Sequence, residues 1–268
     1  MEHTQPEPSS DASSPIPSSP VPTDWFRTAF GGDYLRVYRR RNEAAGLQEA
    51  AFARRHLDLS AEDRVLDLAC GAGRHSAPLA AEGLAVVSFD LSAPLLAEAA
   101  ERLGDRARLV RGDMRVLPFA TGSFDAITSF FTSFGYFSTP GDDARVLAEM
   151  ARVVRREGQL LLELPDRETT VNGLVPASER EEEGRRIAER RWITADGARV
   201  EKEIVVTELS SGRSERNFES VRLYSASEIE RLATAAGWRL AEWVGDFEGA
   251  VWSAGESPRM IGRWERVE

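Results

Sequence analysis

The chain has 268 residues, of which 42% are hydrophobic and 29% charged, a composition typical of a soluble globular protein with one sizeable core. Its formal net charge of −10 argues against a non-specific nucleic-acid binder, which needs a basic face. No apolar run approaches the roughly 18 residues that a membrane span requires, and the N-terminus lacks the basic and apolar parts of a signal peptide. We therefore expect a cytoplasmic protein with neither nucleic acid nor membrane as a partner.

Residues 1–24 contain six prolines and six serines and almost nothing to bury, so we expect a disordered tail there. Residues 25–268 then form one domain, which opens with a helical cap over residues 25–58. Within the cap, Asp33 is the expected N-cap of a helix whose apolar side chains follow at helical spacing. The single cysteine, Cys70, has no partner for an intrachain disulfide and no zinc-type spacing, which agrees with a reducing compartment and no metal site.

A glycine turn stands at the centre of the stretch RVLDLACGAGRHS, residues 64–76. Val65 to Leu68 have the pattern of a buried strand, and Gly71 and Gly73 interrupt it before a helix begins near His75. Glycines allow a ligand to approach the main chain, and the unpaired N–H groups of a helix start favour negative charge. The turn indicates a nucleotide-like ligand, although such turns also join strands to helices for structural reasons alone.

Strands and helices then alternate along the chain. Strand patterns cover residues 85–89, 108–110, 124–131 and 159–164, and helix patterns begin at Ser92 and cover residues 146–154. Such alternation predicts an α/β fold with a doubly wound, mostly parallel sheet, whose ligands bind at the carboxyl ends of the strands. Residues 238–246 and 260–264 supply two last strands, expected as a terminal antiparallel pair, which completes a seven-stranded, Rossmann-like sheet.

An insertion over residues 174–223 departs from this alternation. Strand-like stretches at 185–193, 199–209 and 213–223 are joined by Asp196-Gly197 and Ser211-Gly212, which are strong hairpin turns. We expect an inserted antiparallel ribbon, preceded by a polar segment without a predicted element. The ribbon serves either as a substrate cover or as a dimer element, and the sequence does not decide between them. A helix then begins at the capping-box residues Ser225 and Glu228.

Residues of the glycine turn and carboxylates at the strand ends distinguish between two candidate nucleotide ligands. A nicotinamide dinucleotide site requires a third glycine where this chain has Ser76. Asp90, at the end of the second strand, can accept hydrogen bonds from the ribose hydroxyls of any adenosine. Asp113, after the third strand, can accept from an adenine amino group while Met114 packs on the ring.

Four segments occur in order that resemble the motifs of the class I S-adenosylmethionine-dependent methyltransferase family: LDLACGAGRHS, VVSFDLS, RGDMRVLPF and FDAITSFFTSFGYF. The resemblance covers about residues 34–166. It implies S-adenosylmethionine as cofactor and methyl transfer to an O or N atom of a small-molecule acceptor. The fourth segment lacks the asparagine-proline-proline signature of enzymes that methylate amino groups of nucleic acids. More loosely, the chain is similar to bacterial small-molecule methyltransferases, including those acting on amino sugars.

The resemblance also assigns the cofactor contacts residue by residue. The methionine portion would be lined by Ala69, Gly71 and Gly73, and the ribose bound by Asp90 with Leu91 beside it. The adenine would contact Asp113 and Met114, and Phe130 with Ser129 would lie under the sulfonium. Two residues of the helical cap would help to hold the cofactor, namely Tyr34 and Arg41.

The sequence names no catalytic residue. Methyl transfer chiefly requires alignment and exclusion of water, and only a hydroxyl acceptor generally needs a base. His75 and Tyr136 are both placed to approach the site, but helix-start packing or a hydrogen bond to the cofactor is the favoured role for His75. Two alternatives to the methyltransferase remain, a nicotinamide-dependent oxidoreductase and a catalytically silent cofactor-binding protein of the same fold. A homodimer is possible.

Overall fold

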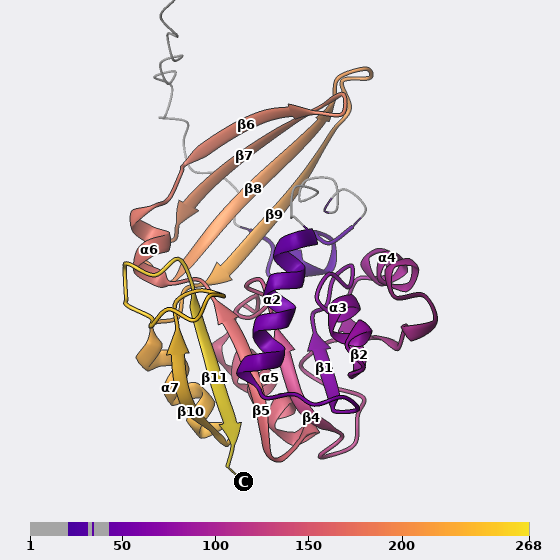
Figure 1. Ribbon diagram of the computed structural model, residues 1–268. Coiled ribbons are helices and arrows are strands. Elements are labelled where there is room, and N and C mark those ends of the chain that lie inside the picture. The colour runs from indigo at the N-terminus through magenta and orange to yellow at the C-terminus, as the bar shows by residue number, and fades with distance from the viewer. Residues whose placement is uncertain (1–20, 32–33, 35–42, 268) are drawn as a thin grey trace, which may run out of the picture.

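A computed structural model describes residues 21–31, 34 and 43–267 (Figure 1). Most of the predicted tail, together with Asp33 and Arg41, lies outside the described residues. The cap that the sequence predicted over residues 25–58 contains the short helix η1 (Trp25–Arg27) and the helix α2 (Glu43–His56). Among the described residues, no helix has both the length and the apolar character needed to cross a membrane.

The main sheet has seven strands, as predicted, in the order β10-β11-β5-β4-β1-β2-β3. Every neighbouring pair from β5 to β3 is parallel, whereas β11 runs antiparallel to both β5 and β10. The prediction of a mostly parallel, doubly wound sheet with a terminal antiparallel pair is therefore confirmed. The strands are β1 (Arg64–Leu68), β2 (Ala85–Asp90), β3 (Leu109–Arg111), β4 (Phe124–Ser129), β5 (Val154–Leu164), β10 (Trp238–Val244) and β11 (Met260–Arg266).

Helices cover both faces of this sheet (Figure 1). Successive side chains of a strand point to opposite faces, and apolar side chains are buried on both of them. In β1, Val65 packs in one core cluster with residues of α2, α3 and α4, whereas Leu66 and Leu68 belong to a second cluster with residues of α5 and α7. Asp67 lies on the first face and is 1% exposed. The helices are α3 (Ser76–Ala81), α4 (Ala93–Leu103), α5 (Pro140–Val153) and α7 (Ala226–Ala235), with a short η2 (Gly104–Arg106) after α4.

Side-chain caps fix where these helices begin. The Ser92 hydroxyl accepts from the Leu95 amide at the start of α4, and Ser225 with Glu228 forms the expected capping box of α7. Helix α5 begins six residues before the predicted start, because Thr139 caps it and Pro140 occupies its first turn. The apolar periodicity used for the prediction begins only at Val146.

The insertion forms a separate antiparallel sheet of four strands in the order β6-β7-β8-β9 (Figure 1). Three of the strands match the predicted stretches, namely β7 (Arg185–Ile193), β8 (Arg199–Glu208) and β9 (Ser214–Arg222). For the polar segment before them the sequence predicted no element. That segment contains α6 (Arg167–Asn172), capped by the side chain of Asp166, and the edge strand β6 (Ala177–Glu182).

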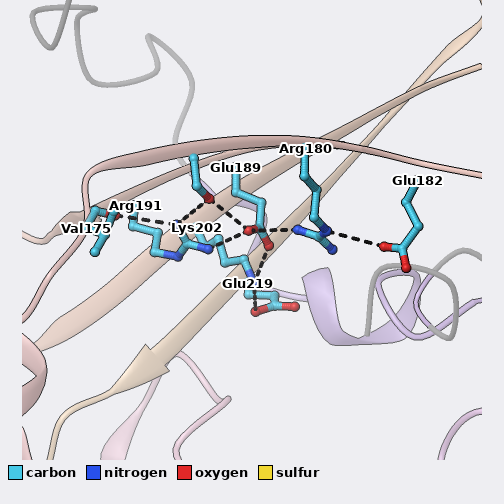
Figure 2. Close-up of polar contacts among 8 residues, drawn as sticks. Val175, Arg180, Glu182, Glu189, Arg191, Lys202 and Glu219 are labelled. Atoms are coloured by element: carbon cyan, nitrogen blue, oxygen red, sulfur yellow. Dashed lines mark hydrogen bonds and ion pairs between the residues drawn. The ribbon is translucent and has the colours of Figure 1, made fainter. Parts of the chain in front are cut away.

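Ion pairs explain how the charged strand β6 joins this sheet. Figure 2 shows Glu189 of β7 at the centre of a network in which its carboxylate lies 3.3 Å from Arg180 of β6, 2.6 Å from Arg191 and 3.2 Å from Lys202 of β8. Burial alone would raise the pKa of the Glu189 carboxyl, but the charges of Lys202 and Arg191 outweigh it and leave this pKa lowered. Three neighbouring cations keep this buried carboxylate ionised. The apolar pattern of the sequence gives no sign of such a network.

Candidate functional site

A cavity of about 630 Å³ opens at the carboxyl ends of the central strands. Its volume falls within the roughly 300–1,000 Å³ typical of small-molecule sites. Because the strands are ordered β3-β2-β1-β4, the segments that follow them lie side by side along one edge of the sheet. These segments contribute Asp113, Asp90, the glycine turn and Phe130, in that order, to the cavity wall.

The glycine turn after β1 is shaped by left-handed residues. Ala69, Gly71 and Gly73 have φ values of 60°, 55° and 75°. The Gly71 amide donates to Asp90 Oδ2 over 2.9 Å, which ties the turn to the end of β2. Gly73 does not line the cavity. A Cβ atom there would lie 3.1 Å from the Cβ of Ala99, so this glycine allows α4 to pack closely against the turn.

Asp90 lies at the cavity wall and is 8% exposed. Its Oδ1 accepts from the Ser92 amide over 2.8 Å, and burial raises the pKa of its carboxyl despite the hydrogen bonds from Ser92 and Gly71. Each carboxylate oxygen offers two lone pairs, so both oxygens keep acceptor capacity toward a ligand. A ligand with a pair of hydroxyl donors fits this position.

Asp113 and Met114 line the neighbouring part of the cavity, after β3. The Arg115 guanidinium donates to both carboxylate oxygens of Asp113, over 3.0 and 2.7 Å, and this hydrogen bonding lowers the pKa of the Asp113 carboxyl. Gly112 is required beside them, because a Cβ there would come within 2.7 Å of the Phe89 ring. This end of the cavity thus offers a fixed acceptor next to the apolar side chain of Met114.

At the other end of the cavity, β4 stops at Ser129, two residues before the predicted end of that strand. Phe131 and Thr132 take φ values of 61° and 57°, a backbone conformation that L-residues rarely adopt, so the ladder ends there. Glu163 of β5 stabilises this turn, since its Oε2 accepts from the Phe131 amide over 2.6 Å. The Glu163 carboxylate is 1% exposed and is paired with Arg259.

A buried charged cluster that the sequence analysis missed adjoins this turn. Glu49 of α2 is 6% exposed, and its Oε2 lies 2.6 Å from Nε2 of His75 and 2.8 Å from Arg74. The imidazole of His75 stacks on the Phe130 ring with 4.0 Å between ring centroids. One signal was present in the sequence: Glu49 interrupts an otherwise small or apolar helix face at the spacing Gly46, Glu49, Ala50, Ala53.

Aromatic side chains from the N-terminal segment and the loop after β4 form the remaining wall. Tyr136 stacks on Phe30 at 5.7 Å, and Phe30 contacts Tyr34 edge-on at 4.9 Å. The four-stranded sheet holds this loop in place, because the Arg199 guanidinium donates to the carbonyl oxygens of Gly135, Tyr136 and Phe137. The strand β8 is thereby fastened to the cavity wall.

The structure brings most of the predicted site residues to this cavity. Those in its lining are Tyr34, Ala69, Gly71, Asp90, Leu91, Asp113, Met114 and Phe130. Gly73 and Ser129 do not line it, and Arg41 lies outside the described residues. His75 and Tyr136, the two candidates for proton transfer, both line it. The set combines two carboxylate acceptors, Asp90 and Asp113, with the apolar side chains of Leu91 and Met114, and this chemistry suits an adenosine.

A doubly wound sheet with carboxylates after β2 and β3 and a glycine turn after β1 defines the class of adenosine-binding α/β proteins. Comparison with known proteins narrows this class. Residues 65–158 match the sequence profile of the family described as "Methyltransferase domain". The chain belongs to the class I S-adenosylmethionine-dependent methyltransferase family, and the predicted family is confirmed.

Two curated relatives and one solved structure show the extent of the similarity. The dTDP-3-amino-3,4,6-trideoxy-alpha-D-glucopyranose N,N-dimethyltransferase of Streptomyces venezuelae is 32% identical over 183 residues, which cover 66% of this chain and 75% of the relative. A demethylmenaquinone methyltransferase of Beutenbergia cavernae is 43% identical over 134 residues, so the chain spans about half (54%) of its length. The S-adenosylmethionine-bound amino pentose methyltransferase CalS10 of Micromonospora echinaspora superposes with a TM-score of 0.65 at 25% identity, over 88% of this chain and 97% of CalS10.

Proposed function

We propose that this protein transfers the methyl group of S-adenosylmethionine to a nitrogen or oxygen atom of a small molecule. One observation carries the proposal. Asp113, Asp90 and the glycine turn lie in the order in which adenine, ribose and methionine follow one another in the donor, because the strands are ordered β3-β2-β1. The methyl-bearing end then falls toward β4, where Phe130, Phe131 and His75 line the cavity.

The bound donor supplies an electrophilic methyl group, and the task of the protein is to align and enclose the reactants. Asp90 accepts hydrogen bonds from the hydroxyl groups of the ribose and so orients this sugar, and Met114 packs on the base. The aromatic side chains Phe30, Phe130 and Tyr136 exclude water from the reacting end. Alignment of this kind lowers a barrier by roughly 7–11 kcal/mol, so it needs few catalytic groups.

We propose an amine as the acceptor, in particular the amino group of a sugar attached to a nucleotide. Two of the similar proteins are named for methylation of amino sugars. The position of the four-stranded sheet supports the proposal of a small, enclosed acceptor, because Arg199 attaches this sheet to the loop that carries Tyr136. On this proposal the sheet acts as a cover over the acceptor side of the cavity, and dimer formation is its alternative role. Sedimentation of the protein at micromolar concentration with and without acceptor distinguishes the two.

Calorimetric titration with S-adenosylmethionine, S-adenosylhomocysteine and NADH tests the donor. We expect micromolar binding of both sulfur compounds and no binding of NADH, and the reverse result would favour the nicotinamide-dependent oxidoreductase. Methyl transfer is then followed by mass spectrometry with two acceptors, dTDP-3-amino-3,4,6-trideoxy-α-D-glucopyranose and demethylmenaquinone. A mass increase of the amino sugar alone is the expected result. Binding of S-adenosylhomocysteine with no methylated product from a broad metabolite extract would support the catalytically silent protein.

A further inference from the structure

We propose that His75, held by Glu49, is the base that removes a proton from the acceptor amine before methyl transfer. The proposal rests on the methyltransferase function proposed above and adds a catalytic residue to it. An amine at neutral pH is largely an ammonium ion, which has no lone pair with which to attack the methyl carbon. A base at the reacting end of the cavity would generate the free amine from the bound ammonium form.

The position of His75 meets this need. It follows the glycine turn, lines the cavity and stacks on Phe130, which belongs to the end of the cavity opposite Asp113. The residue is 5% exposed, so little of the ring is open to bulk water. The ring is fixed in orientation from two sides, by the stacking on Phe130 and by the hydrogen bond to Glu49.

Glu49 sets the protonation pattern of the imidazole. Burial alone would raise the pKa of the Glu49 carboxyl, but this pKa is lowered on balance, with the hydrogen bond that Glu49 accepts from His75 and the charge of Arg74 among the causes, so the group is a carboxylate. A carboxylate only accepts, hence Nε2 of His75 carries the hydrogen across the 2.6 Å contact. The lone pair of the neutral ring then lies on Nδ1, which has no hydrogen-bond partner among the described residues and is not sealed from solvent.

Proton transfer to His75 precedes methyl transfer. The N–H bond of the ammonium group breaks, its proton forms a bond to Nδ1 of His75, and the nitrogen keeps the electron pair. That pair forms the new bond to the methyl carbon as the carbon–sulfur bond of the donor breaks toward sulfur. The imidazolium is stabilised by the Glu49 carboxylate and releases its proton to water after the product leaves. The charged side chains that face His75 come from α2, β1, β5 and the glycine turn, and they are Glu49, Asp67, Glu163 and Arg74.

Two variants and one control test the proposal, with dTDP-3-amino-3,4,6-trideoxy-α-D-glucopyranose as the acceptor. In His75→Gln we expect kcat/KM at pH 7 to fall by roughly 100-fold or more, within the range of general-base contributions, while the dissociation constant of S-adenosylhomocysteine changes less than threefold. The loss should shrink toward pH 9.5, where the acceptor arrives as the free amine. Glu49→Gln should show a smaller loss, about tenfold, with the same pH trend. His56→Gln, a histidine outside the cavity, should match the wild type.

The outcomes separate this proposal from the proposed function. If the wild type methylates the amino sugar but His75→Gln keeps its kcat/KM, or loses it equally at pH 7 and 9.5, or loses binding of S-adenosylhomocysteine to the same extent, then His75 is not the base. If the wild type leaves this amine unmethylated, the acceptor class proposed above fails. Histidine-selective ¹⁵N NMR of the wild type at pH 7 still tests His75 in that case. A ring protonated on Nε2 alone supports the proposal, whereas a proton on Nδ1 overturns it.

Discussion

At the scale of single residues, the carboxylate of Asp90 joins two parts of the cavity. It accepts from the amides of Gly71 and Ser92, so it links the glycine turn after β1 with the start of α4. The same carboxylate lies in the cavity lining, where a ribose needs acceptors. The shape of the cavity wall and the proposed contact with the ribose therefore both depend on the Asp90 side chain.

Replacing this carboxylate should weaken the cofactor site. In Asp90→Asn, one oxygen becomes an amide nitrogen that cannot accept, so we expect the affinity for S-adenosylhomocysteine to fall roughly 10- to 100-fold, as for a lost charged hydrogen bond of about 1.5–3 kcal/mol. Isothermal titration calorimetry measures the change. Asp125→Asn is the matched control: Asp125 opens β4 at the opposite end of the sheet and binds Arg64 and Arg155. Equal affinities in the two variants would refute the ribose role.

Asp143 provides a second prediction, on stability. It is fully buried, and burial raises the pKa of its carboxyl to about 6 even though the Tyr224 hydroxyl donates to it over 2.6 Å. The folded protein thus retains this proton up to about pH 6, whereas the unfolded chain releases it near the ordinary value of 3.8. Stability therefore falls as the pH rises from about 4 to 6, by about 3 kcal/mol for this group. In Asp143→Asn that part of the fall is absent.

Urea unfolding at pH 4 and pH 7 measures this difference. The variant should gain stability relative to the wild type on going from pH 4 to pH 7. Tyr224→Phe serves as the companion variant, because it removes the hydrogen bond but leaves the carboxyl. If the free energies of unfolding of Asp143→Asn and the wild type differ by the same amount at pH 4 and at pH 7, then Asp143 titrates normally in the folded protein.

At the scale of elements, the glycine turn carries a packing role that its motif does not reveal. Gly73 combines a φ of 75° with close contact to Ala99 of α4. Gly73→Ala should therefore destabilise the protein by roughly 2–4 kcal/mol, through both backbone strain and overpacking. Gly237→Ala, at a φ of 89° with no atom near its Cβ position, isolates the backbone part at about 1 kcal/mol. Equal unfolding free energies for the two variants would contradict the packing role.

The four-stranded sheet and the cavity wall are coupled through Arg199. Its guanidinium donates to the carbonyl oxygens of residues 135–137 and to Ser220. We expect Arg199→Ala to lower stability by roughly 2 kcal/mol and to raise the KM for the acceptor, with affinity for S-adenosylhomocysteine little changed. Arg216→Ala removes an arginine of the same sheet that is 65% exposed, and we expect less than about 0.5 kcal/mol from it. Urea unfolding and steady-state kinetics of both variants measure these effects.

Elements with a regular apolar pattern were predictable from the sequence, and charged ones were not. Strands β1 and β2 are runs of apolar residues bounded by turns, and Ser225 with Glu228 marks the start of α7 locally. Strand β6 reads ASEREE, and it is a strand because Arg180 reaches Glu189 on its neighbour. This partner lies nine residues further along, on the next strand of a hairpin, so the signal is a pairing of opposite charges and not the apolar pattern on which the strand predictions rest.

The candidate site divides in the same way. Asp90 and Asp113 were predictable because each follows a strand that ends at the cavity. For Glu49 the sequence offered only its place on a small or apolar helix face, because its partners His75 and Arg74 lie 25 or more residues further along the chain. The turn at Phe131 was hidden too, because the apolar run of β4 continues through it and only the φ values show where the strand ends.

At the scale of the whole molecule, the two sheets should respond separately to the donor. Its predicted contacts lie in the helical cap and in the segments that follow β1, β2, β3 and β4, and none lies on β6–β9. Addition of S-adenosylhomocysteine should therefore slow amide hydrogen exchange in residues 69–76 and 90–92 at least tenfold while leaving residues 177–222 within about twofold. Mass spectrometry of the exchanging protein measures both. Protection confined to the four-stranded sheet would place the donor elsewhere.

The strand order also determines when the main sheet can close during synthesis. Strand β11 is made after every other strand in the described chain, yet it lies between β5 and β10. On the ribosome, β5 and β10 therefore both wait with an open edge until residues 260–266 have emerged. Nascent chains stalled before that point present unpaired backbone groups, and open strand edges of this kind favour association between chains.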